Sequence, residues 1–584
     1  MGRNLNKNEY LAGYNSLSLN LQPIYDLAEI CHQAGISDAI LSPGSRCAPL
    51  VLAFARHPSI KVKTISDERT AAFIALGIAQ GTQRPVVLAC TSGSAAYNYA
   101  PAVAEAFFRK IPLVVLTADR PPEWIGQQDG QTIWQEQLYG KHVCYSGVSL
   151  PDLSHPDARW FLKRVMNEAL NTAIEQSGPV HINLPFREPF YPDKDEDFFY
   201  ESEKQFIPHH RSHTDRLENP EVLNETWQQS AKKLIVIGQM NPSEQEIQFL
   251  EMLIQSMNIP VVGDITSNIH KANGAIQRSD VFLNHLDPEH VRPDLLITFG
   301  GAILSKKTKA FFRKHPPAKH WHIQESGNVP DTFQSITDVL KISPGAFLRH
   351  FAEQTSKDSF SKQKQENYFR LWEMESDRSA RHLEDHFSSG ENFGEFDLVY
   401  ETMKRLPEHC NLHLANSMAV RYANFCGVLS ENKDITVFSN RGTCGIDGCT
   451  STAVGTSLAD PDRLNVLITG DLAFFYDRNA FWHKYELNNL RIIVLNNHGG
   501  GIFRMIQGPS SLPELEPYFE TEQPLNGRAI CSEFNIEYMA CNKRSKTGHF
   551  LNELMAGDNR IKLLELESDS KLNARILSSF NNSF

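Results

Sequence analysis

The sequence predicts an α/β protein with three doubly wound parallel sheets. Short apolar runs alternate with helical patterns through most of the chain, as is typical of parallel sheets. Polar and glycine-rich clusters follow many of these runs, at the strand ends where open α/β sheets bind ligands. At 584 residues the chain is too long for one hydrophobic core. These observations indicate several domains, with candidate ligand sites at the sheet edges.

The first domain is expected over residues 1–192. A helix is predicted over residues 21–34, and strands over 38–41, 61–66, 85–89 and 112–118. Glu68 follows the second strand and begins an alanine-rich helix that extends to about Gln80. Residues 193–222 are charged, aperiodic and contain prolines, which predicts a linker.

Two further domains are expected after this linker. The middle domain spans residues 223–352, with strands over 233–238, 259–262 and 295–299 and a helix near 243–256. A second charged linker is predicted over 353–390. The last domain, residues 391–584, begins with a helix over 396–406.

The most informative stretch is a βαβ unit within residues 465–503. Strands are predicted over 465–469 and 491–495, with a helical segment between them. The first strand ends at Gly470 and Asp471, and the second ends at Asn496 and Asn497. Parallel strands bring both ends to one edge, so an aspartate and an asparagine are expected side by side there.

Oxygen donors beside a helix N-terminus suit Mg²⁺ together with a diphosphate group. The alternative is structural, with Asp471 capping a helix and the Asn-Asn-His-Gly-Gly segment forming a turn. A Gly-Asp pair alone favours this structural interpretation. The second strand end, Asn-Asn-x-Gly, favours the metal site.

Glu68 is the second candidate group. A glutamate at a helix start also has a structural interpretation, because the helix dipole favours it there. Buried and protonated, it would instead serve a heterocyclic nitrogen as a proton partner. A metal-held diphosphate combined with a carboxylic acid for an aminopyrimidine suggests thiamine diphosphate as the cofactor.

Composition excludes several classes of protein. The chain has 41% hydrophobic and 22% charged residues, no long apolar run and no apolar segment at its N-terminus, so neither a membrane span nor a secretory signal is expected. The net charge of −12 argues against nucleic acid as a partner. Ten cysteines without a CxxC pair indicate reduced cysteines in a cytoplasmic protein.

The Gly470-Asp471 and Asn496-Asn497 pairs resemble the signature of thiamine-diphosphate-dependent decarboxylases and carboligases, which have pyrimidine-binding, middle and diphosphate-binding domains. More specifically, the chain resembles the 2-succinyl-5-enolpyruvyl-6-hydroxy-3-cyclohexene-1-carboxylate synthases of menaquinone biosynthesis. The stretches that carry this resemblance are residues 42–46 (SPGSR), 68–70 (ERT), 117–123 (TADRPPE), 416–421 (NSMAVR) and 440–448 (NRGTCGIDG). It is weakest in the middle domain.

The resemblance implies roles for individual residues. Glu68 would act in catalysis and contact the cofactor. Asp471, the Asn497 side chain and the Gly499 carbonyl would ligate Mg²⁺, with Mn²⁺ as a second candidate. Other cofactor contacts would come from Ser417, Ile446 (the apolar wedge that bends the cofactor), Gly470, Leu472 and Ala473. Substrates would be held by Ser45, Arg46, Arg120, Gln131, Lys306, Lys307, Asn416, Arg421 and Arg441.

The substrates that the resemblance implies are 2-oxoglutarate and isochorismate. The first would be decarboxylated, and its remaining four-carbon unit would add 1,4 to the second. Each substrate carries two carboxylates, which arginine forks bind and orient. Each arginine alone favours the interpretation of a solvated loop residue, whereas four of them at strand ends within family motifs favour substrate binding. The resemblance also implies a homodimer or a dimer of dimers with active sites between chains.

Two other functions remain open. An acetolactate synthase or a 2-oxoacid decarboxylase shares the fold, but these enzymes usually take small monoanionic substrates. A non-catalytic nucleotide- or flavin-binding relative would be expected to lack Glu68 or the metal-binding pair. Cys47, Gly130 and His498 depart from the family pattern or have no clear role, with His498 either a proton donor or a surface residue.

Overall fold

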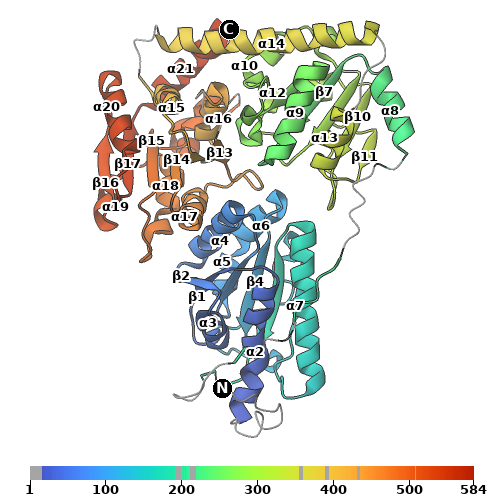
Figure 1. Cartoon of the computed structure of the whole chain (residues 1–584). Helices are drawn as coiled ribbons and strands as arrows, with labels where there is room; N and C mark the ends of the chain where they lie inside the picture. Colours follow the sequence, from blue (N-terminus) through green and yellow to red (C-terminus); the bar gives the residue numbers. More distant parts are fainter. Residues whose placement is uncertain are drawn as a thin grey trace. The chain divides into compact units, whose positions relative to one another are not determined.

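The computed structural model describes residues 16–188, 190–191, 199–200, 203, 205–210, 217, 219–353, 359–388, 393–429, 434–506 and 508–584. These residues form three parallel sheets with helices around them (Figure 1). The predicted α/β class with three parallel sheets is therefore confirmed. The chain divides into two compact units, one of residues 1–211, 451–460 and 477–486 and the other of 212–450, 461–476 and 487–584.

The first unit contains a six-stranded parallel sheet in the order β2-β1-β3-β4-β6-β5. Its strands are β1 (Asp38–Ser42), β2 (Lys61–Thr64), β3 (Val86–Cys90), β4 (Leu113–Asp119), β5 (Tyr145–Val148) and β6 (Val180–Pro185). Its helices are α2 (Ser16–Gln33), α3 (Ala48–Ala55), α4 (Glu68–Thr82), α5 (Ser94–Asn98), α6 (Ala100–Arg109) and α7 (Pro156–Gln176). The strand order reverses between β1 and β3, which makes their carboxyl ends a topological switch point.

Helices cover both faces of this sheet. Val87 and Ala89 of β3 share a core with apolar residues of α2, α3 and α7. Alternation along the strand turns Leu88 toward the opposite face, where α4 packs on β1 and β3. Asp67 caps α4 by accepting the N–H of Thr70 at 3.1 Å, so the helix begins at Glu68 as predicted.

Helix α4 makes a close crossing with α17 (Cys449–Ala459), of which residues 451–459 belong to the same unit. A Cβ atom on Gly77 would lie 2.1 Å from the carbonyl oxygen of Thr452, and one on Gly455 would lie 2.1 Å from that of Ile74. The Thr456 hydroxyl donates to the Gly77 carbonyl at 3.0 Å. The two backbones touch, so only glycine fits at both positions.

Gly77→Ala is expected to destabilise the protein, although alanine is the better helix former. Propensity alone favours alanine by about 0.5–1 kcal/mol. The added methyl group must displace a backbone carbonyl, however, and overpacking costs about 1–3 kcal/mol. Thermal unfolding followed by circular dichroism should therefore show a lower midpoint.

A matched control comes from Gly345 in α13 (Pro344–Ala352), where the nearest atom to an added Cβ is 3.6 Å away. Gly345→Ala should unfold at the wild-type temperature or above, because it gains helix propensity without a clash. A midpoint for Gly77→Ala at or above the wild-type value would contradict the close crossing.

The second unit contains two sheets. The middle sheet has the order β11-β10-β9-β7-β8, and its strands are β7 (Lys233–Ile237), β8 (Val261–Gly263), β9 (Leu295–Phe299), β10 (Lys319–Ile323) and β11 (Asp338–Leu340). The helices of this region are α8 (Pro220–Gln229), α9 (Glu244–Met257), α10 (Ser279–Phe282), α11 (Pro288–Val291), α12 (Lys306–Lys314), α13 and α14 (Ser359–Ser388).

Two segments were expected to be linkers. Residues 353–390 contain the 30-residue helix α14, whose Tyr368 and Trp372 are buried in a core of the middle sheet. Residues 193–222 lie partly outside the described residues. Their described part includes Phe206, which is buried in the first core, and the start of α8. The domain limits themselves stay predictions.

The last sheet has the order β13-β12-β14-β15-β17-β16, the same topology as the first. Its strands are β12 (Cys410–Leu414), β13 (Ile435–Phe438), β14 (Leu464–Gly470), β15 (Leu490–Asn496), β16 (Glu537–Ala540) and β17 (Lys562–Glu567). Its helices are α15 (Glu395–Lys404), α16 (Met418–Cys426), α18 (Asp471–Tyr476), α19 (Arg528–Glu533), α20 (Arg544–Met555) and α21 (Ser570–Ser583). The predicted strand-helix-strand order after residue 465 is confirmed by β14, α18 and β15.

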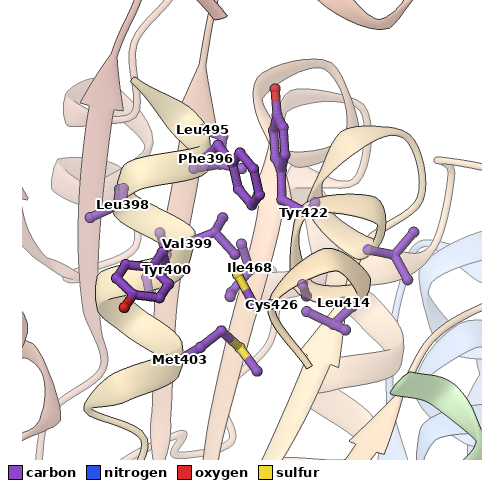
Figure 2. Packing of buried hydrophobic residues seen from close by; sticks show 14 of the residues in the cluster. Phe396, Leu398, Val399, Tyr400, Met403, Leu414, Tyr422, Cys426, Ile468 and Leu495 are labelled. Carbon is purple, nitrogen blue, oxygen red and sulfur yellow. The ribbon is translucent and has the colours of Figure 1, made fainter. Parts of the chain in front are cut away.

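Buried side chains pack α15 and α16 against the strands of the last sheet (Figure 2). Phe396 of α15 stacks on Tyr422 of α16 with ring centroids 5.0 Å apart. Ile468 of β14 and Leu495 of β15 belong to the same core. This packing fixes the start of α15 relative to α16 and the central strands.

Candidate active site

The candidate residues fall into two groups, one in each unit. In the second unit, Asp471 directly follows β14 and is 2% exposed. Its carboxylate accepts the side-chain N–H of Gln523 at 2.8 Å, and backbone N–H groups of Leu472 and Gly499 also bond to it. Burial raises the pKa of Asp471, and these hydrogen bonds oppose that rise. The carboxylate is thus held beside Gly499.

The two asparagines after β15 have different roles. Asn496 is fully buried and donates to Glu565 at 2.9 Å and to the Leu525 carbonyl at 3.0 Å. The Asn497 amide donates to Glu395 at 2.6 Å, and its oxygen accepts only a long 3.3 Å bond, from Gly501, among the described contacts. Asn496 therefore anchors the strand end, whereas the Asn497 oxygen is the better placed candidate ligand.

The loop after Asn497 keeps its shape through close backbone contacts. A Cβ on Gly499 would lie 2.5 Å from the carbonyl oxygen of Glu520, so only glycine fits. His498 has a positive φ of 59°. Its ring nitrogens lie 3.2 Å from the Gln523 carbonyl oxygen and 3.9 Å from the Glu567 carboxylate. These contacts favour the interpretation of His498 as a loop-stabilising residue.

This donor set fits a magnesium ion. Within the described residues, no group of three or more His, Cys, Asp or Glu side chains is arranged to hold a metal. A site here therefore depends on one carboxylate with amide and carbonyl oxygens, which Mg²⁺ accepts. The pKa of Glu395 is raised to about 7, chiefly by burial and in part by repulsion from the Asp471 carboxylate. A cation would offset this repulsion.

The glycine-rich loop after β13 is tied to the end of β12 by Asn416. The Asn416 amide donates to the carbonyls of Asn440 and Gly445, both at 2.7 Å, and its oxygen accepts from Arg441 at 2.7 Å. Asn416 therefore supports Arg441 and the loop that contains Ile446. Its proposed direct contact with substrate stays a prediction.

Cations gather around this loop. Burial and then the neighbouring Arg441 guanidinium lower the pKa of Arg421, whose Nη1 donates to the Ser417 carbonyl at 2.5 Å. Ser417 has a positive φ of 75°, a strained conformation for serine. Lys309 of α12 also interacts electrostatically with Arg441. We call this group the arginine–lysine cluster, which consists of Arg421, Arg441 and Lys309. Its cationic groups are suited to binding carboxylates.

Lys306 and Lys307 begin α12, and their positions differ. Lys306 is exposed, whereas Lys307 is partly buried and donates to the Asp280 carbonyl at 2.7 Å. Burial lowers the pKa of Lys307, and the Asp280 carboxylate opposes that shift. Lys309, which sequence reasoning missed, lies one helical turn after Lys306, and this i, i+3 spacing was the available signal.

A buried polar network supports these cations. Asp264 accepts the backbone N–H groups of Leu304 at 2.6 Å and Ser305 at 3.1 Å. The Ser305 hydroxyl donates to Asp280, which also accepts from Asn424 of α16 at 3.1 Å. Burial and then the charge of Asp280 raise the pKa of Asp264 to about 6. The network fixes the start of α12 against α16.

In the first unit, Glu68 lies at the start of α4, beyond β2. Its carboxylate is half-buried and accepts from the Asn98 amide at 3.2 Å. The second group thus contains two sets of residues, one around Asp471 and Asn497 and one around Arg421 and Arg441. Within the first group the structure brings Glu68 to the carboxyl edge of its sheet, as predicted.

The other first-unit candidates lie after β1 and β4. Arg46 is buried, donates to the Phe186 carbonyl at 2.9 Å and lies over the Phe190 ring at 4.4 Å. Arg120 donates to the Gly130 carbonyl at 2.8 Å and so holds the loop of Gln131, which is exposed. The Ser45 hydroxyl lies 3.3 Å from that of Tyr191. Arg46 thus has protein partners and Gln131 is exposed, and the contacts of both with substrate stay predictions.

Sequence reasoning missed the residue that fixes the Gln131 loop. Gln135 is 1% exposed and donates to the Ala118 carbonyl at 3.0 Å and to Asn183 at 2.9 Å, and it accepts from the Gly93 N–H at 2.9 Å. Asn183 in turn donates to Asp119 at 2.8 Å, and burial raises the pKa of Asp119 to about 6. No local sequence signal marks these long-range contacts.

Three family models match the chain. They describe the N-terminal binding domain of thiamine pyrophosphate enzymes over residues 25–138, the middle domain over 198–414 and the C-terminal binding domain over 422–565. Thiamine pyrophosphate is another name for thiamine diphosphate. The fold and its domain order therefore define a thiamine-diphosphate-dependent enzyme.

Curated relatives narrow this class. A 2-succinyl-5-enolpyruvyl-6-hydroxy-3-cyclohexene-1-carboxylate synthase from Cytophaga hutchinsonii is 42% identical over 570 residues, covering 96% of this chain and 98% of the relative. Synthases of the same name from Flavobacterium psychrophilum and Porphyromonas gingivalis are each 36% identical over 95% of this chain. The chain belongs to this synthase family.

Proposed function

We propose that the chain joins 2-oxoglutarate to isochorismate in menaquinone biosynthesis. The bond between C1 and C2 of 2-oxoglutarate breaks and CO₂ leaves. C2 then adds 1,4 to the ring double bond of isochorismate, and uptake of one proton gives 2-succinyl-5-enolpyruvyl-6-hydroxy-3-cyclohexene-1-carboxylate. The observation that carries this proposal is the arginine–lysine cluster, because both substrates are dicarboxylates. The names of the relatives support the same product.

Thiamine diphosphate, when bound, would supply the electron sink for the decarboxylation. The residues after β14 and β15 would hold its diphosphate end through Mg²⁺, with Mn²⁺ as a second candidate. We assign the metal to the Asp471 carboxylate, the Asn497 amide oxygen and the Gly499 carbonyl. Gly470, Leu472, Ala473, Ser417 and Ile446 would line the cofactor, the last as an apolar support for its rings.

Glu68 would hold and release a proton at the aminopyrimidine of the cofactor. Glu68 begins helix α4, which packs closely against α17 at Gly77. This packing holds the helix that carries the carboxyl group. Arg421 and Arg441 would bind substrate carboxylates, and their mutual repulsion would be relieved by that anion. Lys306 and Gln131, both exposed, would contact the substrates from α12 and from the loop after β4.

We further propose that the protein is cytoplasmic and works as a homodimer or dimer of dimers. Each active site would combine the Glu68 group of one chain with the Asp471 group of another. None of the described helices has the length and apolar character that a membrane span requires. No nucleic acid partner is proposed, since the net charge is −12.

Mixing two inactive variants tests the shared site. Chains with Glu68→Gln and chains with Asp471→Ala, co-expressed in equal amounts, should regain about one quarter of wild-type activity. Half of the randomly paired dimers are mixed, and each mixed dimer has one intact site. Activity no higher than that of either variant alone would place both groups of a site on one chain.

A rate assay tests the function itself. Protein, Mg²⁺, thiamine diphosphate and 2-oxoglutarate are mixed with isochorismate, whose absorbance is followed. We expect its loss to require every component. Brisk acetolactate formation from pyruvate, without turnover of isochorismate, would favour an acetolactate synthase. Release of aldehyde from a 2-oxoacid alone would favour a simple decarboxylase.

A further inference from the structure

Glu395 is a buried acidic residue for which the proposed chemistry has no direct use. It is the first residue of α15 and is 1% exposed. Its backbone N–H donates to the Asn573 side chain of α21 at 3.1 Å. The next residue, Phe396, stacks on Tyr422 in the core (Figure 2). The helix start is therefore fixed on two sides, and the Glu395 carboxylate has a defined position.

That carboxylate contacts the candidate metal ligand directly. Its Oε1 atom accepts the Asn497 amide N–H at 2.6 Å, a short hydrogen bond. Hydroxyl groups of Tyr422 and Ser568 bond to the same carboxylate. Glu395 thus has partners on α16 and after β17 in addition to Asn497.

The bond selects one orientation of the Asn497 amide. An asparagine side chain presents oxygen on one side and NH₂ on the other, and the two orientations differ in what they offer a metal. The Nδ2 atom of Asn497 is the one that bonds to Glu395 Oε1, so the amide oxygen is turned away from that carboxyl oxygen. That oxygen accepts a single bond of 3.3 Å, from the Gly501 N–H, among the described contacts.

We propose that Glu395 is a positioning residue that directs the amide oxygen of Asn497 toward the metal of the diphosphate site. This inference rests on the proposed function, in which Asn497 is a metal ligand. Residues behind the ligands of a metal commonly fix the orientation of those ligands, and their loss lowers metal affinity about 10–100-fold.

The alternative is that Glu395 only stabilises the start of α15, as acidic residues at helix N-termini do. Metal affinity distinguishes the two roles. In isothermal titration calorimetry, Mg²⁺ is titrated into the full chain with saturating thiamine diphosphate. Glu395→Ala should raise the Kd for Mg²⁺ about 10–100-fold. Glu395→Gln keeps an acceptor oxygen of the same reach and should lie between wild type and Glu395→Ala.

Glu401→Gln is the matched control, since Glu401 lies on the same helix and pairs with Arg405 instead of the site. Its Kd for Mg²⁺ should equal that of the wild type. A double-mutant cycle adds a second readout: Glu395→Ala should have no further effect on a chain that already carries Asn497→Ala. Additive losses in this cycle would assign Glu395 a structural role only.

Wild-type Mg²⁺ affinity in folded Glu395→Ala would overturn the inference while leaving the proposed function intact. If Glu395→Ala does not fold, wild-type affinity in folded Glu395→Gln would overturn the inference equally. If the wild-type chain itself shows no Mg²⁺-dependent binding of thiamine diphosphate, the assigned metal site fails first. The two failures are therefore distinguishable.

Discussion

Glu68→Gln is expected to lower kcat by about 10²–10⁴-fold, the range that positioned proton transfer contributes. Glutamine has the same shape and can still accept the bond that the Asn98 amide donates at 3.2 Å. It cannot, however, give or take a proton at the aminopyrimidine. Binding of thiamine diphosphate should therefore stay close to that of the wild type.

Two separate measurements check this result. Turnover is measured with saturating substrates, and cofactor binding is measured separately by fluorescence or calorimetry. Glu136→Gln makes the same chemical change at an exposed position of the same unit and should retain full turnover. Full turnover in Glu68→Gln would remove Glu68 from the mechanism. Loss of cofactor binding would instead make it a binding residue.

Asp471→Ala should weaken Mg²⁺-dependent binding of thiamine diphosphate by at least about 100-fold, because it removes a charged ligand outright. The apoprotein should still fold, because burial of this carboxylate already opposes its charged form. Calorimetric titration of the cofactor at several Mg²⁺ concentrations measures the effect.

The control for this variant is Asp462→Ala, an exposed aspartate before β14. This substitution removes a carboxylate at the opposite end of the same strand, so the variant should bind the cofactor normally. A normal titration for Asp471→Ala, with Mg²⁺ still required, would contradict the assignment of Asp471 as a ligand. A titration that no longer depends on Mg²⁺ would support it.

Much of the fold is predictable because hydrophobic periodicity is local. The apolar run of residues 295–299 predicts strand β9 with its observed limits, and β14 and β15 extend by one residue at each end beyond the predicted ranges. The location of the residues that follow strands could also be predicted, because parallel strands bring their carboxyl ends to one edge of the sheet. Glu68 and Asp471 are both found at such edges.

The roles of other residues depend on contacts between distant segments. The contact of Arg46 with substrate stays a prediction, but the bond from its guanidinium to the Phe186 carbonyl, far along the chain, could not be predicted. Asn416 is occupied by two carbonyls and by Arg441. Glu395 has the same local pattern as any glutamate at a helix start, and only the fold shows that it meets Asn497. Such pairings leave no local periodic signal.

The coupling of decarboxylation to carbon–carbon bond formation is the central claim, and isotope balance tests it directly. 2-Oxoglutarate labelled with ¹³C at C1 is incubated with isochorismate and the holoenzyme, and both CO₂ and the product are analysed by mass spectrometry. We predict one labelled CO₂ for each isochorismate consumed, and an unlabelled product that contains the other four carbons of 2-oxoglutarate. Labelled CO₂ released at the same rate without isochorismate, or a product that retains the label, would contradict the account.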